Sequence, residues 1–409
     1  MNGNELAALT KRDLEPLLAA TSTVGAQVVA RRKRGGRGAP GNQMWISIPG
    51  GSEVRLTRSL PLDKWEAALL EPYGNALADL EGVPDAVARN ASDDVVLRAI
   101  AAQLGAGHAP AFEDAIRFLL RSAVATYEGQ PLHLNLLLDL DRAPGASVMT
   151  LAELRTFDWH ALLGSGLETG ILLDQAGGVV ELVDIRVLPG IPAGVVNDAF
   201  RPDVFRLVGD WTMAGQRVAL SLSRSRELLV HQSGALRYVL RAGAWRGLPL
   251  DVARRTGWSA GASINTAVKR AILASVIDSS LAHHGGSLAV VVKGQKHAFL
   301  NGNIVKAGDL WPTNVRSRLF GSCDFLSLTR RQRLELLSMD GATVIDHRGQ
   351  ILAAGAIVAV GPGSTGGGRL AATRSLARFG AAFKVSQDGP ISLFGRDIAG
   401  NVELKMGFA

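Results

Sequence analysis

The sequence contains one cysteine, Cys323, and no uninterrupted apolar run as long as a membrane helix needs. A single cysteine excludes an intrachain disulfide, so we expect Cys323 to be a buried or loop thiol rather than a nucleophile. The N-terminal segment has acids among its apolar residues and no small-residue cleavage signature, unlike a secretory signal. These absences predict a cytoplasmic protein without a membrane partner.

The most specific metal and nucleotide motifs are also missing. His283 and His284 are adjacent and have no further ligand at metal-site spacing, so we expect them to serve a cap or a turn. No Lys-Ser or Lys-Thr pair follows the glycines at 361–369, which excludes a Walker phosphate-binding loop.

Basic residues exceed acids, giving a net charge of +7 and a pI near 9.8, which suits an anionic partner. One run is dense, RRKRGGRG, and it has no interleaved aromatic side chains for base stacking. A solvated loop and a nucleic-acid or partner contact are both open for this run. Its basic residues are Arg31, Arg32, Lys33, Arg34 and Arg37.

The length of 409 residues predicts more than one domain, and the apolar patterns divide the chain into three regions. Helical spacing dominates the first region, although MWISIP at 44–49 alternates like a short strand. The second region is rich in strands and ends in an antiparallel meander at 217–248, broken by Ser-Gly and Ala-Gly pairs. The predicted regions are 1–128, mainly helical with the basic loop 31–37, then 129–258, rich in strands, and 262–409, a mixed β-sheet flanked by helices.

Chemistry-bearing residues concentrate in the third region, between 338 and 394. Asp340, Gly341 and Ala342 come directly before an apolar strand pattern. One interpretation is a carboxylate whose small neighbours let a ligand approach the backbone; the other is a plain helix-to-strand turn, since Asp-Gly is a favoured turn pair.

The glycine-rich loop at 361–369 lies between a strand pattern and a helical run. Backbone N–H groups at such a helix start favour an anion, and Arg369 could bind a phosphate with its guanidinium fork. A flexible surface loop is the competing interpretation. The turn at 386–389 and the helix-face arginines Arg374 and Arg378 could serve phosphate or solvent equally well.

The same loop matches the dinucleotide fingerprint G-x-G-x-x-G at Gly361, Gly363 and Gly366, with Asp388 downstream. A nicotinamide enzyme is therefore one hypothesis. It is disfavoured because too little chain follows Asp388 to complete a doubly wound sheet, and because Pro362 removes an amide from the loop.

Taken together, these motifs resemble the nucleotide-binding domain of the diadenylate cyclase (DAC) family over residues 262–409. Asp340-Gly341-Ala342 matches the Asp-Gly-Ala that leads a strand in that family, and SLAVVVKG at 287–294 matches its opening strand. Gly367-Gly368-Arg369 lies where Gly-Thr-Arg belongs in the family's Gly-Thr-Arg-His-Arg. Ser386-Gln387-Asp388 lies where the family has its acidic turn.

The resemblance implies two ATP molecules held between two domains with Mg²⁺ or Mn²⁺, and synthesis of c-di-AMP with Asp340 as the catalytic and metal-binding carboxylate. This sequence departs from that pattern at the charged groups. Leu370 and Ala371 replace the His and second Arg, and Gln387 replaces an acid. Such losses remove transition-state stabilisation more than they remove a pocket, so the chain resembles the DAC-like sensor domains called DACNV.

We therefore expect a nucleotide or cyclic-dinucleotide sensor or effector that forms a homo-oligomer and acts in stress or defence signalling. An active diadenylate cyclase, with Arg374 standing in for the missing arginine, and a nucleic-acid-binding module are the alternatives. The candidate nucleotide-binding residues are Asp340, Gly341, Ala342, Gly366, Gly367, Gly368, Arg369, Thr373, Arg374, Ser386, Gln387 and Asp388.

Overall fold

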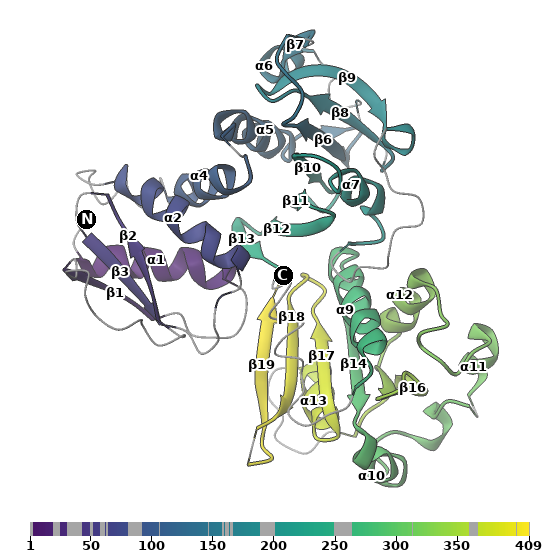
Figure 1. Ribbon diagram of the computed structural model, residues 1–409. Coiled ribbons are helices and arrows are strands. Elements are labelled where there is room, and N and C mark those ends of the chain that lie inside the picture. The colour runs from purple at the N-terminus through teal and green to yellow at the C-terminus, as the bar shows by residue number, and fades with distance from the viewer. Residues whose placement is uncertain are drawn as a thin grey trace. The chain divides into compact units, whose positions relative to one another are not determined.

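The computed structural model describes residues 3–18, 25–30, 43–49, 52–57, 62, 64–80, 92–105, 107–145, 147–157, 159, 163, 167–188, 201–248, 264–312, 314–359, 367–397 and 399–408. The chain forms two compact units (Figure 1). Residues 1–196 with 205–248 are called the N-terminal unit, and residues 197–204 with 249–409 the C-terminal unit. The mixed α/β class predicted from the sequence is confirmed, whereas the division into three regions stays a prediction.

The N-terminal unit contains a three-stranded antiparallel sheet in the order β1-β3-β2. Its strands are β1 (Gly25–Ala30), β2 (Gln43–Ser47) and β3 (Ser52–Thr57). The sequence predicts only the strand at β2. In β3, Val54 and Leu56 are fully buried and alternate with Glu53 and Arg55, so this short strand carries a period of two that sequence reasoning missed.

The second sheet of this unit has eight strands in the order β13-β12-β11-β10-β6-β8-β9-β7. The meander predicted at 217–248 is confirmed as four consecutive antiparallel strands, β10 to β13. The strands are β6 (Leu134–Asp139), β7 (Met149–Thr150), β8 (Thr169–Leu173), β9 (Gly178–Asp184), β10 (Arg217–Leu222), β11 (Leu228–Gln232), β12 (Ala235–Arg241) and β13 (Ala244–Gly247). A separate two-stranded ladder joins β4 (Thr126–Tyr127) and β5 (Gln130–Pro131).

Helices cover both faces of the eight-stranded sheet. Leu136 of β6 packs in one cluster with Phe112 of α5, whereas the next residue, Leu137, packs with Trp211 of α7. Successive strand residues point to opposite faces, so α5 and α7 lie on opposite sides. The helices are α1 (Gly3–Leu17), α2 (Lys64–Ala78), α4 (Ser92–Leu104), α5 (Ala109–Ser122), α6 (Leu151–Leu154), the 3₁₀ turn η2 (Ile185–Val187) and α7 (Arg206–Trp211).

The C-terminal unit is built on a six-stranded mixed sheet in the order β16-β15-β14-β17-β18-β19. The strands β14 and β15 are parallel, and the other neighbouring pairs are antiparallel. The strands are β14 (Gly286–Val291), β15 (Ala342–Asp346), β16 (Ile351–Ala356), β17 (Gly380–Val385), β18 (Ile391–Arg396) and β19 (Val402–Phe408).

The helices of this unit lie on two sides of its sheet. Helices α9 and α12 pack on each other, as Figure 1 shows, and Thr343 of β15 donates a hydrogen bond to the Leu336 carbonyl of α12. The neighbouring Val344 packs instead with Leu376 of α13, on the opposite face. The helices are α9 (Thr266–Leu281), η3 (Lys293–Gln295), α10 (Lys296–Asn301), η4 (Ala307–Asp309), α11 (Val315–Phe320), α12 (Arg330–Ser338) and α13 (Gly368–Ala377).

No helix among the residues that the structure describes has the length and apolar content to span a membrane.

Candidate functional site

Several of the sequence-predicted residues of the C-terminal unit converge at one edge of its sheet. At this edge the parallel strands β14 and β15 begin and the antiparallel strand β17 ends, because Gly286 pairs with Val385. Asp340 lies two residues before β15, and the turn containing Gln387 follows β17 directly. Arg369, at the start of α13, reaches the same place. The structure thus brings together segments that are far apart in the sequence.

Asp340 and Arg369 face each other at this edge. Their closest charged atoms, Asp340 Oδ1 and Arg369 Nη2, are 4.0 Å apart. The Asp340 side chain is 91% exposed and that of Arg369 is 36% exposed, so water screens the pair and both groups remain accessible. An anionic ligand could contact the guanidinium while a ligand hydroxyl contacts the carboxylate.

The lack of a side chain at Gly285 leaves space for the guanidinium of Arg369. A Cβ added to Gly285 would lie 2.3 Å from Arg369 Nη1 and 3.0 Å from Gln387 Cγ. The guanidinium therefore occupies the space that a side chain at position 285 would fill, beside the stem of Gln387. Sequence reasoning missed this contribution of Gly285, since no local motif couples residue 285 to residue 369.

The first turn of α13 offers backbone donors beside the guanidinium. Gly367 has a φ of +84°, and a Cβ added to Gly367 or Gly368 would meet no atom within 4 Å. The first N–H groups of a helix have no partner inside it, so they can point to an anion. The preceding loop 361–366, including Gly366, lies outside the described residues.

Two other predicted residues of α13 lie away from this edge. Thr373 is completely buried; its hydroxyl donates to the Arg369 carbonyl at 2.7 Å and lies 2.9 Å from Ser287 Oγ. It therefore fixes α13 to β14, and its hydroxyl is not accessible to a ligand. The guanidinium of Arg374 lies 5.6 Å from the ring centroid of Phe394, so it covers β18 rather than facing Asp340.

The turn between β17 and β18 forms the other wall of the site. Gly389 N–H donates to the Ser386 carbonyl at 3.0 Å, and Gln387 and Asp388 at the tip are exposed. The ammonium of Lys384 donates a hydrogen bond to Ser386 Oγ. Ser280 of α9 donates to the Gly389 carbonyl at 2.6 Å, which holds the turn against the helix.

His283 and His284, predicted as cap or turn residues, also reach this edge. His283 has a φ of +54°, and its Nδ1 lies 3.0 Å from the Gln387 carbonyl oxygen. His284 Nδ1 lies 2.7 Å from Ser338 Oγ, just before Asp340. The two rings thus connect the end of α9 to both walls of the site, which adjacency in the sequence could not reveal.

Gly341 is required by the geometry of the strand start. It has a φ of +99°, and an added Cβ would lie 2.6 Å from the Gly355 carbonyl carbon and 2.7 Å from the Ala356 carbonyl oxygen. Positive φ costs an L-residue about 1–2 kcal/mol, and forcing an atom into packed backbone adds a similar amount. We expect Gly341→Ala to lower the free energy of unfolding by about 2–3 kcal/mol.

Thermal or chemical unfolding of the full-length chain measures this cost. Gly294→Ala is the matched control, because an added Cβ there meets nothing within 4 Å. Equal stability of the two variants would contradict the requirement for glycine at position 341.

The described residues do not provide a preformed metal centre. Among them, no group of three His, Cys, Asp or Glu side chains is arranged to hold a metal ion. Asp340 is largely exposed and faces a guanidinium rather than a second carboxylate. Mg²⁺ is usually bound through one or two carboxylates together with water and substrate phosphates, so the described residues form no dedicated metal cage at this edge.

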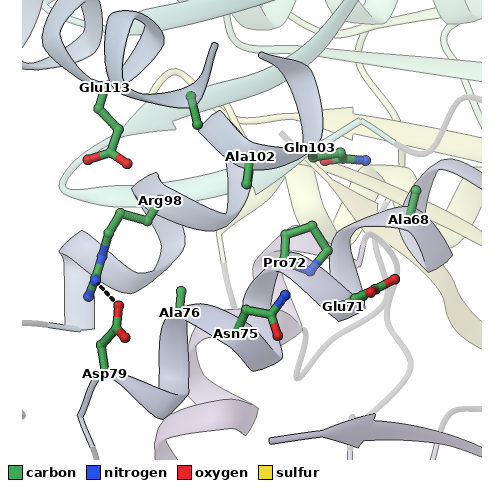
Figure 2. Close-up of a pocket in the computed structure, with 11 residues that line it drawn as sticks. Ala68, Glu71, Pro72, Asn75, Ala76, Asp79, Arg98, Ala102, Gln103 and Glu113 are labelled. Carbon is green, nitrogen blue, oxygen red and sulfur yellow. Dashed lines mark hydrogen bonds and ion pairs between the residues drawn. The ribbon is translucent and has the colours of Figure 1, made fainter. Parts of the chain in front are cut away.

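A concave surface lies in the N-terminal unit, between α2, α4 and α5 (Figure 2). It has a volume of about 690 Å³, and Arg98 within it pairs with Asp79. Glu71 and Glu113 add two further carboxylates to the lining. Three carboxylates against one guanidinium make this lining net acidic, which does not favour phosphate groups.

The sequence also singled out the lone cysteine and the basic run. Cys323 is an exposed loop thiol between α11 and α12. The basic run 31–37 lies outside the described residues.

Comparison with known proteins gives a partial structural resemblance. No protein-family model and no curated protein matches the sequence. A hypothetical membrane spanning protein from Bacillus cereus aligns with 16% identity and a TM-score of 0.24 over 33% of this chain. The alignment spans 61% of that protein, less than two thirds of its length. A double cysteine mutant of DacA from Staphylococcus aureus aligns with 14% identity and a TM-score of 0.24 over 34% of this chain and 85% of DacA. About a third of the chain is thus similar to a diadenylate cyclase domain, with low sequence identity and a low TM-score.

Proposed function

We propose that the C-terminal unit binds a nucleotide or a cyclic dinucleotide at the edge formed by Gly285, Asp340, Arg369 and Gln387. The observation that carries this proposal is the convergence of a guanidinium, a helix N-terminus and an exposed carboxylate there. A phosphate would contact Arg369 and the first N–H groups of α13. Asp340 would accept a hydrogen bond from a ribose hydroxyl, and the exposed turn at 386–388 would border the base or sugar.

The arrangement supports binding better than catalysis. Phosphoryl transfer depends on positioning and on stabilising the charge of the transferred group. Where the family has a second arginine, this chain has Ala371, which is buried, and Arg374 lies over Phe394 instead. With Gln387 in place of an acid, the site keeps a phosphate contact but has few groups that would act in the transition state. We therefore propose a sensor or effector, acting as a homo-oligomer in stress or defence signalling.

The alternative of a nicotinamide enzyme has less support. In the C-terminal unit, β14 and β15 are the parallel pair among the described strands, and β17, β18 and β19 continue antiparallel. Dinucleotide enzymes of the fingerprint type use a mostly parallel, doubly wound sheet. The nucleic-acid hypothesis stays a prediction, because it depends on residues 31–37.

Incubation of the purified chain with labelled ATP and Mg²⁺ or Mn²⁺ separates a sensor from a diadenylate cyclase. We expect no c-di-AMP and no other turnover, with ATP or c-di-AMP retained by the protein in equilibrium dialysis. Arg369→Ala should weaken retention about 10- to 100-fold, because a hydrogen bond to a charged group contributes about 1.5–3 kcal/mol.

Arg378→Ala is the matched control, since Arg378 is an exposed arginine that directly follows the same helix. Equal weakening by the two substitutions would point to a general effect of charge instead of a site at Arg369. Formation of c-di-AMP that disappears in Asp340→Ala would replace the sensor by a cyclase.

A further inference from the structure

Lys384 lies on the same face of the sheet as the start of α13. It is the cross-strand partner of Ser287, and directly paired residues of neighbouring strands point to the same face. Ser287 Oγ lies 2.9 Å from Thr373 Oγ1 of α13, which identifies this face. The side chain of Lys384 therefore lies under α13, one strand away from Gly285 and its bound guanidinium.

The ammonium of Lys384 is directed toward the proposed binding edge. It donates a hydrogen bond to Ser386 Oγ, at the end of β17. The next residue, Gln387, lies beside the Arg369 guanidinium, in the space next to Gly285. Lys384 from β17 and Arg369 from α13 thus approach the same edge of the sheet.

Lys384 differs from Lys296 and Lys405 in its electrostatic partners. Lys296 pairs with Asp346 at 3.1 Å, and Lys405 pairs with Glu403. Among the described residues, no carboxylate lies within salt-bridge distance of Lys384, although it is partly buried. Partial burial of a cation without a countercharge costs free energy, and a bound anion would offset that cost.

We propose that Lys384 is a second phosphate-binding residue of this site, acting with Arg369 on the same nucleotide phosphate. This inference rests on the proposed function and adds a residue that none of the sequence motifs contains. The arginine fork would contact two phosphate oxygens, and the lysine would act as a point charge on a third. The lysine thereby supplies a positive charge in a chain that has Ala371 where the family has its second arginine.

Substitution of Lys384 by glutamine tests the proposal in the full-length chain. Glutamine removes the charge but can still hydrogen-bond to Ser386. We expect Lys384→Gln to weaken binding of ATP and of c-di-AMP about 10-fold or more in equilibrium dialysis, and Lys384→Arg to retain most of it.

Lys405→Gln is the matched control. It removes the same charge from the same sheet, on β19, two strands away from β17. Its effect on nucleotide binding should stay within about twofold. Equal effects of Lys384→Gln and Lys405→Gln would overturn the assignment while leaving the nucleotide site in place. Unfolding curves of both variants report whether either change disturbs the fold.

Pyrophosphate, measured by thermal shift, separates failure of this inference from failure of the proposed function. If the wild-type chain binds pyrophosphate but neither nucleotide, and Lys384→Gln abolishes that binding, the phosphate role of Lys384 stands and the nucleotide function falls. If the wild-type chain binds neither nucleotide nor pyrophosphate, both proposals are wrong.

Discussion

Replacing Arg330 by methionine is expected to lower the free energy of unfolding of the C-terminal unit by about 3–5 kcal/mol, because it leaves a buried carboxylate without its countercharge. Arg330 donates from Nε and Nη2 to the two carboxylate oxygens of Asp278, at 2.8 and 2.7 Å. The Asp278 side chain is 3% exposed and that of Arg330 is 12% exposed. Burial raises the pKa of Asp278, and Arg330 opposes that shift.

The same pair also holds the chain segment at 201–204. Arg330 Nη1 donates to the Arg201 carbonyl at 2.7 Å, and the Asp203 N–H donates to Asp278 Oδ1 at 3.0 Å. Loss of the guanidinium therefore removes its two hydrogen bonds to Asp278 and its hydrogen bond to the Arg201 carbonyl. It also leaves the Asp278 carboxylate without this countercharge. Hydrogen exchange of the α9 and α12 amides in the full-length chain measures the change.

Arg331→Met is the control, because the neighbouring Arg331 is 73% exposed and forms only a surface pair with Glu335. Its substitution should change stability by about 1 kcal/mol at most. The double variant Asp278→Leu with Arg330→Met should recover most of the loss, since an apolar pair leaves no buried charge. If Arg330→Met and Arg331→Met had the same free energy of unfolding, the buried ion pair would contribute no more to stability than the exposed one.

Acid is expected to destabilise the N-terminal unit through two buried histidines. His133 and His231 both contact Phe205, each with its ring centroid 5.8 Å from that of the phenylalanine. Burial, assisted by the Arg224 charge, lowers the pKa of His133 to about 4. Burial alone lowers the pKa of His231 to about 3. Among the described residues, neither nitrogen of His231 has a hydrogen-bond partner.

The direction of the pH effect follows from these lowered values. In the unfolded chain the histidines bind protons below pH of about 6.5, whereas in the folded chain they stay neutral until lower pH. Their contribution to stability is therefore complete above pH of about 6.5 and is lost as pH falls toward 4 and 3. Between pH 7 and 5 we expect a loss of about 2 kcal/mol per histidine, about 4 kcal/mol together.

Unfolding of the full-length chain by denaturant at pH 7, 6 and 5 measures this loss. His231→Leu should reduce the pH dependence by about half and should cost little at pH 7, since it removes a buried ring without hydrogen-bond partners. An unchanged pH dependence in His231→Leu would exclude this ring as the source.

Local patterns made several elements of both units predictable. The meander predicted at 217–248 is confirmed as β10 to β13, and the helical spacing of apolar residues that follows residue 262 agrees with α9. Asp174 and Asp346 each accept hydrogen bonds from two backbone N–H groups of their own hairpin turns. Each of these features depends on residues close together in the sequence, which periodicity and turn chemistry describe well.

The site was less predictable, because its geometry depends on contacts across the sheet. The seat of Arg369 on Gly285 and the position of Lys384 beside Ser287 follow from the order of β14 and β17. That order cannot be read from turn signals. Thr373 was predicted as a nucleotide-binding residue, but its hydroxyl bonds inside the fold.

The last turn of α9 has a mechanical consequence. Asp278 holds the segment 201–204, Ser279 donates to the His284 carbonyl, and Ser280 donates to the Gly389 carbonyl of the turn after β17. Three consecutive side chains at the end of one helix therefore join the segment 201–204, the loop after α9 and the turn after β17 within the C-terminal unit.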